Sequence, residues 1–216
     1  MIRRESTRCG IVALIGAPNS GKSTLMQTLA GLRKPYNWEG NCSWDDFSVL
    51  SSYMGQSPFL FRDSLKENIL YGVEKPQKET LEKLWSYLEI SGVDSFLRKF
   101  SKDLSAEVGS LNCSLSGGQL QRFLLARTIL RNHPMILLDE ATSALDETKE
   151  EEVIRKFKSW AYDSQKTVLA VTHRVNLLSL YDEVWYLQDK KIFAKGPHQD
   201  LLSIKEYRDF CEKSLT

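Results

Sequence analysis

The sequence predicts an α/β fold built on a parallel sheet, and three observations support this. Short apolar runs rich in branched residues recur at residues 10–15, 135–138 and 167–171. Segments with helical spacing of apolar residues separate these runs, and such alternation of strands and helices is typical of parallel sheets. The length of 216 residues suits a single domain.

The first elements are expected to be a strand, a glycine loop and a helix, in that order. Residues 10–15 (GIVALI) are uninterruptedly apolar, which indicates a strand buried on both faces. A helix is expected over residues 22–30, because Leu25, Met26 and Leu29 recur at helical spacing and Gly31 supplies a stop. Residues 38–53 carry polar and aromatic residues in short pieces, which predicts small strands that lead to Gln56.

The middle of the chain is expected to be mostly helical. In residues 76–100 the apolar positions that are spaced for an amphipathic helix are Leu81, Leu84, Trp85, Leu88 and Ile90. We interpret residues 57–132 as a helical subdomain inserted into a nucleotide-binding domain that spans residues 1–216. After it, a strand at 135–138, a helix at about 147–162, a strand at 167–171, a further helix and a strand at 183–187 restore the alternating pattern.

Composition and charge exclude several classes of function. The 29 basic and 28 acidic side chains give a net charge of +1, so no nucleic-acid partner is expected. No stretch approaches the roughly 18 consecutive apolar residues that a membrane span needs. Any link to a membrane must therefore come through another protein or domain.

Residues 16–23 (GAPNSGKS) follow the pattern of a phosphate-binding loop. Gly16 and Gly21 let the backbone approach a phosphate closely, so that N–H groups and the amino end of the next helix can surround the anion. Lys22 would reach the β and γ phosphates, and Ser23 offers its hydroxyl to Mg²⁺. The predicted nucleotide-binding residues of this segment are Gly16, Ala17, Pro18, Asn19, Ser20, Gly21, Lys22, Ser23 and Thr24.

Two carboxylates follow the strand at residues 135–138. Asp139 and Glu140 stand at its carboxyl end, where ligands bind in open α/β sheets. We expect Asp139 to hold Mg²⁺ through water and Glu140 to polarise the water that attacks the nucleotide. No Asn-Lys-x-Asp motif, which would read a guanine base, occurs in the sequence, so ATP is expected rather than GTP.

Residues 115–119 read LSGGQ and precede a helical pattern at residues 119–130, which Ser116 is well placed to cap. The phosphate loop, LSGGQ, MILLDE and a histidine at the end of a later strand occur in this order. With these motifs the chain resembles the nucleotide-binding domain of ATP-binding cassette (ABC) proteins, from about residue 10 to its last residues. The resemblance implies a P-loop NTPase (RecA-like) core with the inserted α-helical subdomain.

The resemblance also implies a head-to-tail dimer, homo- or heteromeric. In the family, LSGGQ meets the γ phosphate that a second domain holds, through the Ser116 and Gly118 amides and the positive end of the helix. Asp146 in SALD matches the loop that links the two nucleotide sites. The residues predicted to bind nucleotide across the dimer are Leu115, Ser116, Gly117, Gly118, Gln119 and Asp146.

Two further site residues follow from the resemblance alone. Gln56 would touch the metal and the attacking water, and the loop after it would meet a transmembrane permease, although Phe59, Leu60 or Phe61 could instead be core residues. His173 would contact the γ phosphate. The sequence of residues 60–69, which contains KENI, resembles that of exporter-type cassettes.

One departure from the family concerns adenine. Family members usually place an aromatic residue before the phosphate loop, whereas none of the 15 residues before Gly16 is aromatic. We expect either a chain that starts late, with a truncated antiparallel β subdomain, or another way of holding adenine, for which Tyr36 and Trp38 are candidates.

The leading hypothesis is the ATP-hydrolysing domain of an exporter-type ABC transporter, at the cytoplasmic side of a membrane through its permease partner. The expected cofactors are ATP and Mg²⁺, with Glu140, His173, Gln56 and Lys22 as catalytic residues and Ser23, Gln56 and Asp139 at the metal. One alternative is a soluble ABC-type ATPase that is not linked to transport. Another is a non-hydrolysing nucleotide-binding regulator, against which the presence of Glu140 and His173 argues.

Overall fold

A computed structural model describes residues 9–39, 43–56, 59–73, 76, 78, 82–100, 104–108 and 115–214. The chain divides into two compact units. The first comprises Met1–Tyr53, His133–Glu140 and Lys158–Thr216, and the second comprises Met54–Asn132 and Ala141–Phe157. The helical segment predicted over residues 57–132 falls in the second unit, which also takes in the stretch after the acidic strand.

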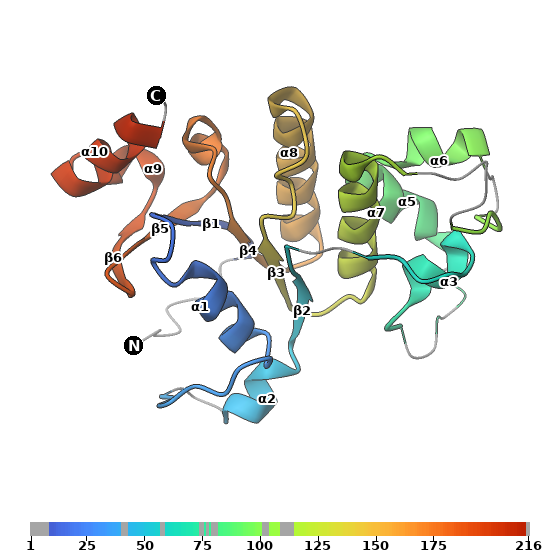
Figure 1. Ribbon diagram of the computed structural model, residues 1–216, viewed down its shortest axis with the longest axis horizontal. Helices are drawn as coiled ribbons and strands as arrows, with labels where there is room; N and C mark the ends of the chain where they lie inside the picture. Colours follow the sequence, from blue (N-terminus) through green and yellow to red (C-terminus); the bar gives the residue numbers. More distant parts are fainter. Residues whose placement is uncertain are drawn as a thin grey trace. The chain divides into compact units, whose positions relative to one another are not determined.

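A six-stranded sheet runs through the first unit in the order β2-β3-β4-β1-β5-β6 (Figure 1). The strands are β1 (Gly10–Gly16), β2 (Ser51–Met54), β3 (Met135–Asp139), β4 (Thr167–Val171), β5 (Glu183–Gln188) and β6 (Lys191–Gly196). β1 pairs in parallel with β4 and β5, and β3 pairs in parallel with β4, whereas β6 is antiparallel to β5. The predicted α/β fold with a mainly parallel sheet is confirmed. The carboxyl ends of β1, β3 and β4 consequently share one edge of the sheet.

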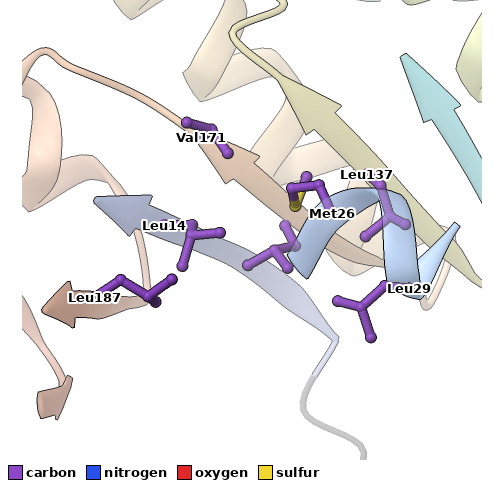
Figure 2. Packing of buried hydrophobic residues seen from close by; sticks show 7 residues of the cluster. Leu14, Met26, Leu29, Leu137, Val171 and Leu187 are labelled. Carbon is purple, nitrogen blue, oxygen red and sulfur yellow. The ribbon is translucent and has the colours of Figure 1, made fainter. Parts of the chain in front are cut away.

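Helix α1 (Lys22–Leu29) covers one face of this sheet, as Figure 2 shows. Its Met26 and Leu29 are buried in a cluster with residues from four strands: Leu14, Leu137, Leu169, Val171 and Leu187. Full burial of each such side chain stabilises the fold by about 1.5–3 kcal/mol. The helix is thereby fixed directly behind the glycine loop. It ends as predicted, because Gly31 takes the left-handed conformation, with φ of 76°.

The carboxyl-terminal helices α9 (His198–Leu201) and α10 (Lys205–Ser214) were not predicted from the sequence. Tyr186 of β5 contacts Tyr207 and Phe210 of α10, with ring centroids 5.6 and 5.1 Å apart. Because successive strand residues point to opposite faces, and Leu187 belongs to the cluster around α1, α10 packs on the other face. β6, the antiparallel edge strand, was also not predicted.

Two predicted elements differ from the structure in the first unit. Residues Trp44–Ser48 form a short helix, α2, rather than a strand. The reason is local: the Ser43 hydroxyl accepts a hydrogen bond from the Asp46 amide, and an N-cap of this kind outweighs the β preference of nearby aromatic residues. The helix expected after β4 is a 3₁₀ helix, η1 (Val175–Leu180).

The second unit contains α3 (Leu65–Leu70), α5 (Leu84–Ile90), α6 (Asp94–Phe100), α7 (Gly117–Leu130) and the start of α8 (Glu147–Asp163). In the described residues, the amphipathic spacing predicted within residues 76–100 corresponds to α5, and Gly92, with φ of 73°, separates α5 from α6. Leu84 and Leu88 are buried as expected, and Leu81 lies outside the described residues. No helix in the described part of the chain has the length and apolar character that a membrane crossing requires.

Candidate functional site

The phosphate-binding loop joins the end of β1 to the start of α1. A side chain on Gly16 would collide with the carbonyl oxygen of Leu187 and place its Cβ 2.8 Å from Ser20 Oγ, so only glycine fits there. Gly21 caps α1 in the left-handed conformation, with φ of 102°, and offers no side-chain acceptor to the helix. The first amides of α1 therefore carry no side-chain cap and are free to bind an anion.

Lys22 is 7% exposed and curls over this loop. Its Nζ donates to the carbonyl oxygens of Gly16, at 2.8 Å, and Ala17, at 3.0 Å. Burial lowers the pKa of Lys22, and the nearby carboxylates of Glu140 and Asp139 raise it in opposition. The ammonium group thus lies at the loop and interacts electrostatically with both carboxylates.

Asp139, at the end of β3, is 1% exposed. Its two carboxylate oxygens accept from hydroxyl groups on different elements: Ser23 Oγ at 3.4 Å and Tyr53 Oη at 3.2 Å. Burial raises the pKa of Asp139, and these two hydrogen bonds work against that rise. Burial and, next, the charge of Asp139 raise the pKa of Tyr53 to about 12, so the phenol remains a donor at neutral pH. Tyr53 was not predicted as a site residue.

Glu140 and His173 are in direct contact, with His173 Nε2 2.7 Å from Glu140 Oε1. Both side chains are accessible, at 53% for His173 and 28% for Glu140. Glu140 has a left-handed backbone, with φ of 57°, which is uncommon outside glycine and asparagine and clusters at functional sites. Two residues 33 positions apart in the sequence thus meet at the ends of neighbouring strands.

The other predicted residues of the phosphate loop differ in burial. Ala17, Pro18, Asn19 and Thr24 are exposed. Ser20 is 7% exposed, and its hydroxyl has no hydrogen-bond partner within the described part of the chain. Such a buried hydroxyl is available to a ligand oxygen. Of the candidates for binding adenine, Tyr36 is fully exposed, and Trp38 contacts Phe47 with tilted rings whose centroids are 5.0 Å apart.

The LSGGQ segment lies in the second unit, where it begins α7. Ser116 caps the helix as predicted: its Oγ accepts from the Gln119 amide, and Gln119 Oε1 accepts from the Ser116 amide at 2.8 Å. Gly117 and Gly118 form the first turn, and Leu115 is half-buried. Gln56 is exposed and also belongs to the second unit.

Asp146 caps the next helix, α8. Its Oδ1 accepts from the Lys149 amide at 2.9 Å, and its Oδ2 pairs with Lys149 Nζ at 2.6 Å. The hydrogen bond from Lys149 lowers the pKa of Asp146. The side chain predicted to link two nucleotide sites therefore has a local structural role as well.

Comparison with known sequences decides the family, because the sequence pattern of the ABC transporters matches residues 6–143. The chain belongs to the ABC transporter family. Members of this family bind and hydrolyse ATP, and the match covers the phosphate loop, LSGGQ and the acidic strand.

Similar ABC proteins come from distant organisms. A multidrug resistance ABC transporter ATP-binding and permease protein of Lactococcus lactis is 28% identical over 221 residues, 98% of this chain and 37% of that protein. The mouse ATP-binding cassette sub-family B member 10, mitochondrial, is 34% identical over 202 residues, 89% of this chain and 28% of that protein. The chain spans 36% of the length of export ATP-binding/permease proteins of Rickettsia.

A solved ABC structure has the same fold. The structure of a bacterial Atm1-family ABC exporter with ATP bound superposes with a TM-score of 0.80 and 26% sequence identity. It covers 96% of this chain, which corresponds to 37% of that exporter. The fold of this chain is thus the fold of an ABC exporter's ATP-binding domain.

Proposed function

We propose that this chain is the ATP-hydrolysing domain of an exporter-type ABC transporter. It would bind Mg-ATP at the end of β1, β3 and β4, dimerise head to tail with a second ATP-binding domain, and drive a transmembrane permease. It would be held at the cytoplasmic side of the membrane by that permease. The Lactococcus lactis and Rickettsia relatives are named as ATP-binding and permease proteins, which supports this arrangement.

The observation that carries the proposal is the convergence of four kinds of group at one edge of the sheet. The strand ends supply a glycine loop with open amides, a buried lysine, a hydroxyl bound to a carboxylate, and a second carboxylate bound to a histidine. Phosphoryl transfer needs such parts, because its catalysis consists mostly of positioning and of neutralising phosphate charge. Lys22 would release its loop carbonyls and pair with the β and γ phosphates.

The residues present fit a magnesium ion. Ser23 Oγ and Asp139 Oδ1 meet at 3.4 Å, so a hydroxyl and a carboxylate oxygen converge at one place. Mg²⁺ prefers oxygen ligands and is commonly held by one or two protein groups together with substrate phosphates and waters. Bound there, Mg²⁺ would neutralise phosphate charge, with Ser23 and Asp139 holding it and Gln56 as a further ligand.

Glu140 is the proposed general base. Its carboxylate would accept the proton of the attacking water as the oxygen bonds to the γ phosphorus, and ADP would leave. The contact with His173 fixes the direction of this carboxylate, because a side chain held by a hydrogen bond samples fewer rotamers. His173 would also donate to the γ phosphate. The phosphate loop, Asp139, Glu140 and His173 of the first unit would form one half of the site, and Ser116 and Gly118 of a second copy would supply the other half.

The test is phosphate release from Mg-ATP by the purified protein and its Glu140→Gln variant. A positioned general base contributes roughly 10² to 10⁴ in rate, so Glu140→Gln should lose that factor while it still binds ATP. The matched control is Glu183→Gln, since Glu183 stands at the amino end of β5 rather than at the carboxyl ends of the strands, and its Oε1 accepts from Trp185 Nε1 at 2.8 Å. A parent that binds ATP without turnover would indicate the regulator, and equal rates for both variants would remove Glu140 from the mechanism.

A further inference from the structure

The loop that follows Glu140 belongs to the unit of LSGGQ rather than to the unit of Glu140. The boundary between the two compact units falls between Glu140 and Ala141. Residues 141–146 (ATSALD) therefore group with α7, although they directly continue a strand of the first unit. The contacts of this loop within the second unit explain the grouping.

Gln121, which was not predicted as a site residue, holds the loop. It lies in the second turn of α7 and is 8% exposed. Its Nε2 donates to Ser143 Oγ at 3.1 Å, and its Oε1 accepts from the Ala144 amide at 2.9 Å. A single buried amide thus satisfies consecutive residues of the loop, one through its side chain and one through its backbone.

The glycine turn of LSGGQ touches the same loop. A Cβ placed on Gly118 would lie 3.1 Å from the carbonyl oxygen of Ala144 and 3.3 Å from Leu145 Cδ2, whereas one on Gly117 would meet no described residue within 4 Å. Leu145 itself is 4% exposed. The backbone of the LSGGQ turn and the backbone of the loop are therefore packed against each other.

The other side of the loop is tied to α8. Thr142 Oγ1 donates to Glu150 Oε1 at 2.7 Å, and Glu150 is 1% exposed. Asp146 caps the helix through the Lys149 amide. The loop is consequently held between α7 and α8, and its one link to α7 by side-chain hydrogen bonds is Gln121 among the described residues.

We propose that Gln121 is a positioning residue that couples LSGGQ to the ATSALD loop, so that both present one rigid surface to the nucleotide of a second copy. This inference rests on the proposed function for its consequence in catalysis. Ser116 and Gly118 would reach the partner's γ phosphate only when the turn is in register with Ser143–Asp146. Gln121 acts through these neighbours and touches no nucleotide.

A buried glutamine that merely satisfies the interior would behave differently from a positioning residue. In the first case its loss lowers stability and leaves the turnover of folded protein unchanged. In the second it lowers turnover at equal folded fraction. Conservative replacement separates the two further: Gln121→Glu can accept from both Ser143 Oγ and the Ala144 amide, whereas Gln121→Met has a similar shape and makes neither hydrogen bond.

The first measurement is independent of ATP hydrolysis. Amide hydrogen exchange of residues 141–146 is compared in the full chain for the parent, Gln121→Met, Gln121→Glu and a control, Thr128→Val. Thr128 lies in the same helix, is 4% exposed, and bonds only to the Leu124 carbonyl of its own helix among the described contacts. Faster exchange of the loop in Gln121→Met alone supports the coupling, and unchanged exchange in that variant overturns it.

The second measurement is ATPase turnover, normalised to the folded fraction, together with the affinity for the analogue AMP-PNP. Gln121→Met should lose about tenfold or more in kcat, as expected for misplaced groups, with AMP-PNP affinity unchanged because the phosphate loop lies in the other unit. Gln121→Glu should recover most of the turnover, and Thr128→Val should match the parent. Equal turnover of Gln121→Met and parent, or an equal loss in Thr128→Val, contradicts the inference.

The two measurements distinguish this inference from the proposed function. If the parent does not hydrolyse ATP, the proposed function fails while hydrogen exchange still decides whether Gln121 holds the loop. If the parent hydrolyses ATP and Gln121→Met is equally active, the proposed function stands and the role of Gln121 falls.

Discussion

Asp139 is held by two hydroxyl groups that come from different parts of the chain. Ser23 follows the phosphate loop, and Tyr53 is the third residue of β2. With both oxygens engaged, the carboxylate has a fixed orientation despite the cost of burial, which raises its pKa. Ser23 and Asp139 are the proposed metal-binding pair. The hydrogen bond from Tyr53 orients the carboxylate of Asp139.

Replacing Tyr53 by Phe should weaken this arrangement without unfolding the protein. The loss of one partly buried hydrogen bond costs about 1 kcal/mol, whereas removal of a group that orients a metal ligand typically costs about 10- to 100-fold in metal affinity or activity. We therefore expect the Mg²⁺ concentration for half-maximal ATPase activity to rise at least about tenfold. Tyr87→Phe, on α5 of the second unit, is the control. An unchanged Mg²⁺ requirement would leave Tyr53 with a packing role only.

At the scale of the elements, the two glycines of LSGGQ have different surroundings. In the part of the chain that the structure describes, nothing lies within 4 Å of a Cβ on Gly117, so alanine there should add helix propensity and leave the free energy of unfolding equal or higher by up to about 1 kcal/mol. Gly118 approaches the Ala144 carbonyl, so alanine there must displace the loop. Chemical denaturation should rank Gly118→Ala below Gly117→Ala in stability. The reverse order would show that residues 141–146 can move away from Gly118 at little cost in free energy.

The elements that the sequence predicted correctly are those with strong local signals. Strand β1, helix α1 and strand β4 combine apolar periodicity with a glycine or polar stop, and their bounds agree with prediction within one residue. Residues Trp44–Ser48 differ from the prediction because the Ser43 cap begins a helix in a segment whose aromatic residues favour strands. The separation of α5 from α6 at Gly92 is a single-residue effect, because glycine takes the left-handed backbone there.

The candidate site was predicted where function resides in a contiguous motif. Lys22, Ser23, Asp139 and Glu140 follow from motifs, His173 follows from the family resemblance, and the structure places them at one sheet edge. Tyr53 and Gln121 were missed because their partners lie 86 and 22 residues away, and each looks like an ordinary strand or helix residue. Only the strand order β2-β3 and the packing of α7 bring these contacts about.

At the scale of the whole molecule, the groups proposed for ATP hydrolysis are divided between two units of one chain. The first unit holds the phosphate loop, Asp139, Glu140 and His173, and the second holds LSGGQ with its coupled loop. The chain spans little more than a third of relatives that combine ATP-binding and permease parts, at 36–37% of their length. The account's central claim is that LSGGQ of one copy completes the site of another.

Mixing two inactive variants tests this claim most directly. Lys22→Ala damages the first-unit half of a site, and Ser116→Arg damages the half given to the partner, so each variant alone has two defective sites. In a mixed dimer one composite site carries both defects and the other carries none. The test requires high protein concentration and Mg-ATP, because dimerisation depends on both.

The account predicts that a one-to-one mixture regains up to about a quarter of the parent's ATPase activity, because half of randomly assorted dimers are mixed and each of these has one intact site. Each variant alone should stay inactive at the same total concentration, with far-ultraviolet circular dichroism showing that both are folded. Sedimentation with one variant labelled should show mixed dimers. No recovery of activity in a sample where mixed dimers are present would contradict the assignment of LSGGQ to the partner's site.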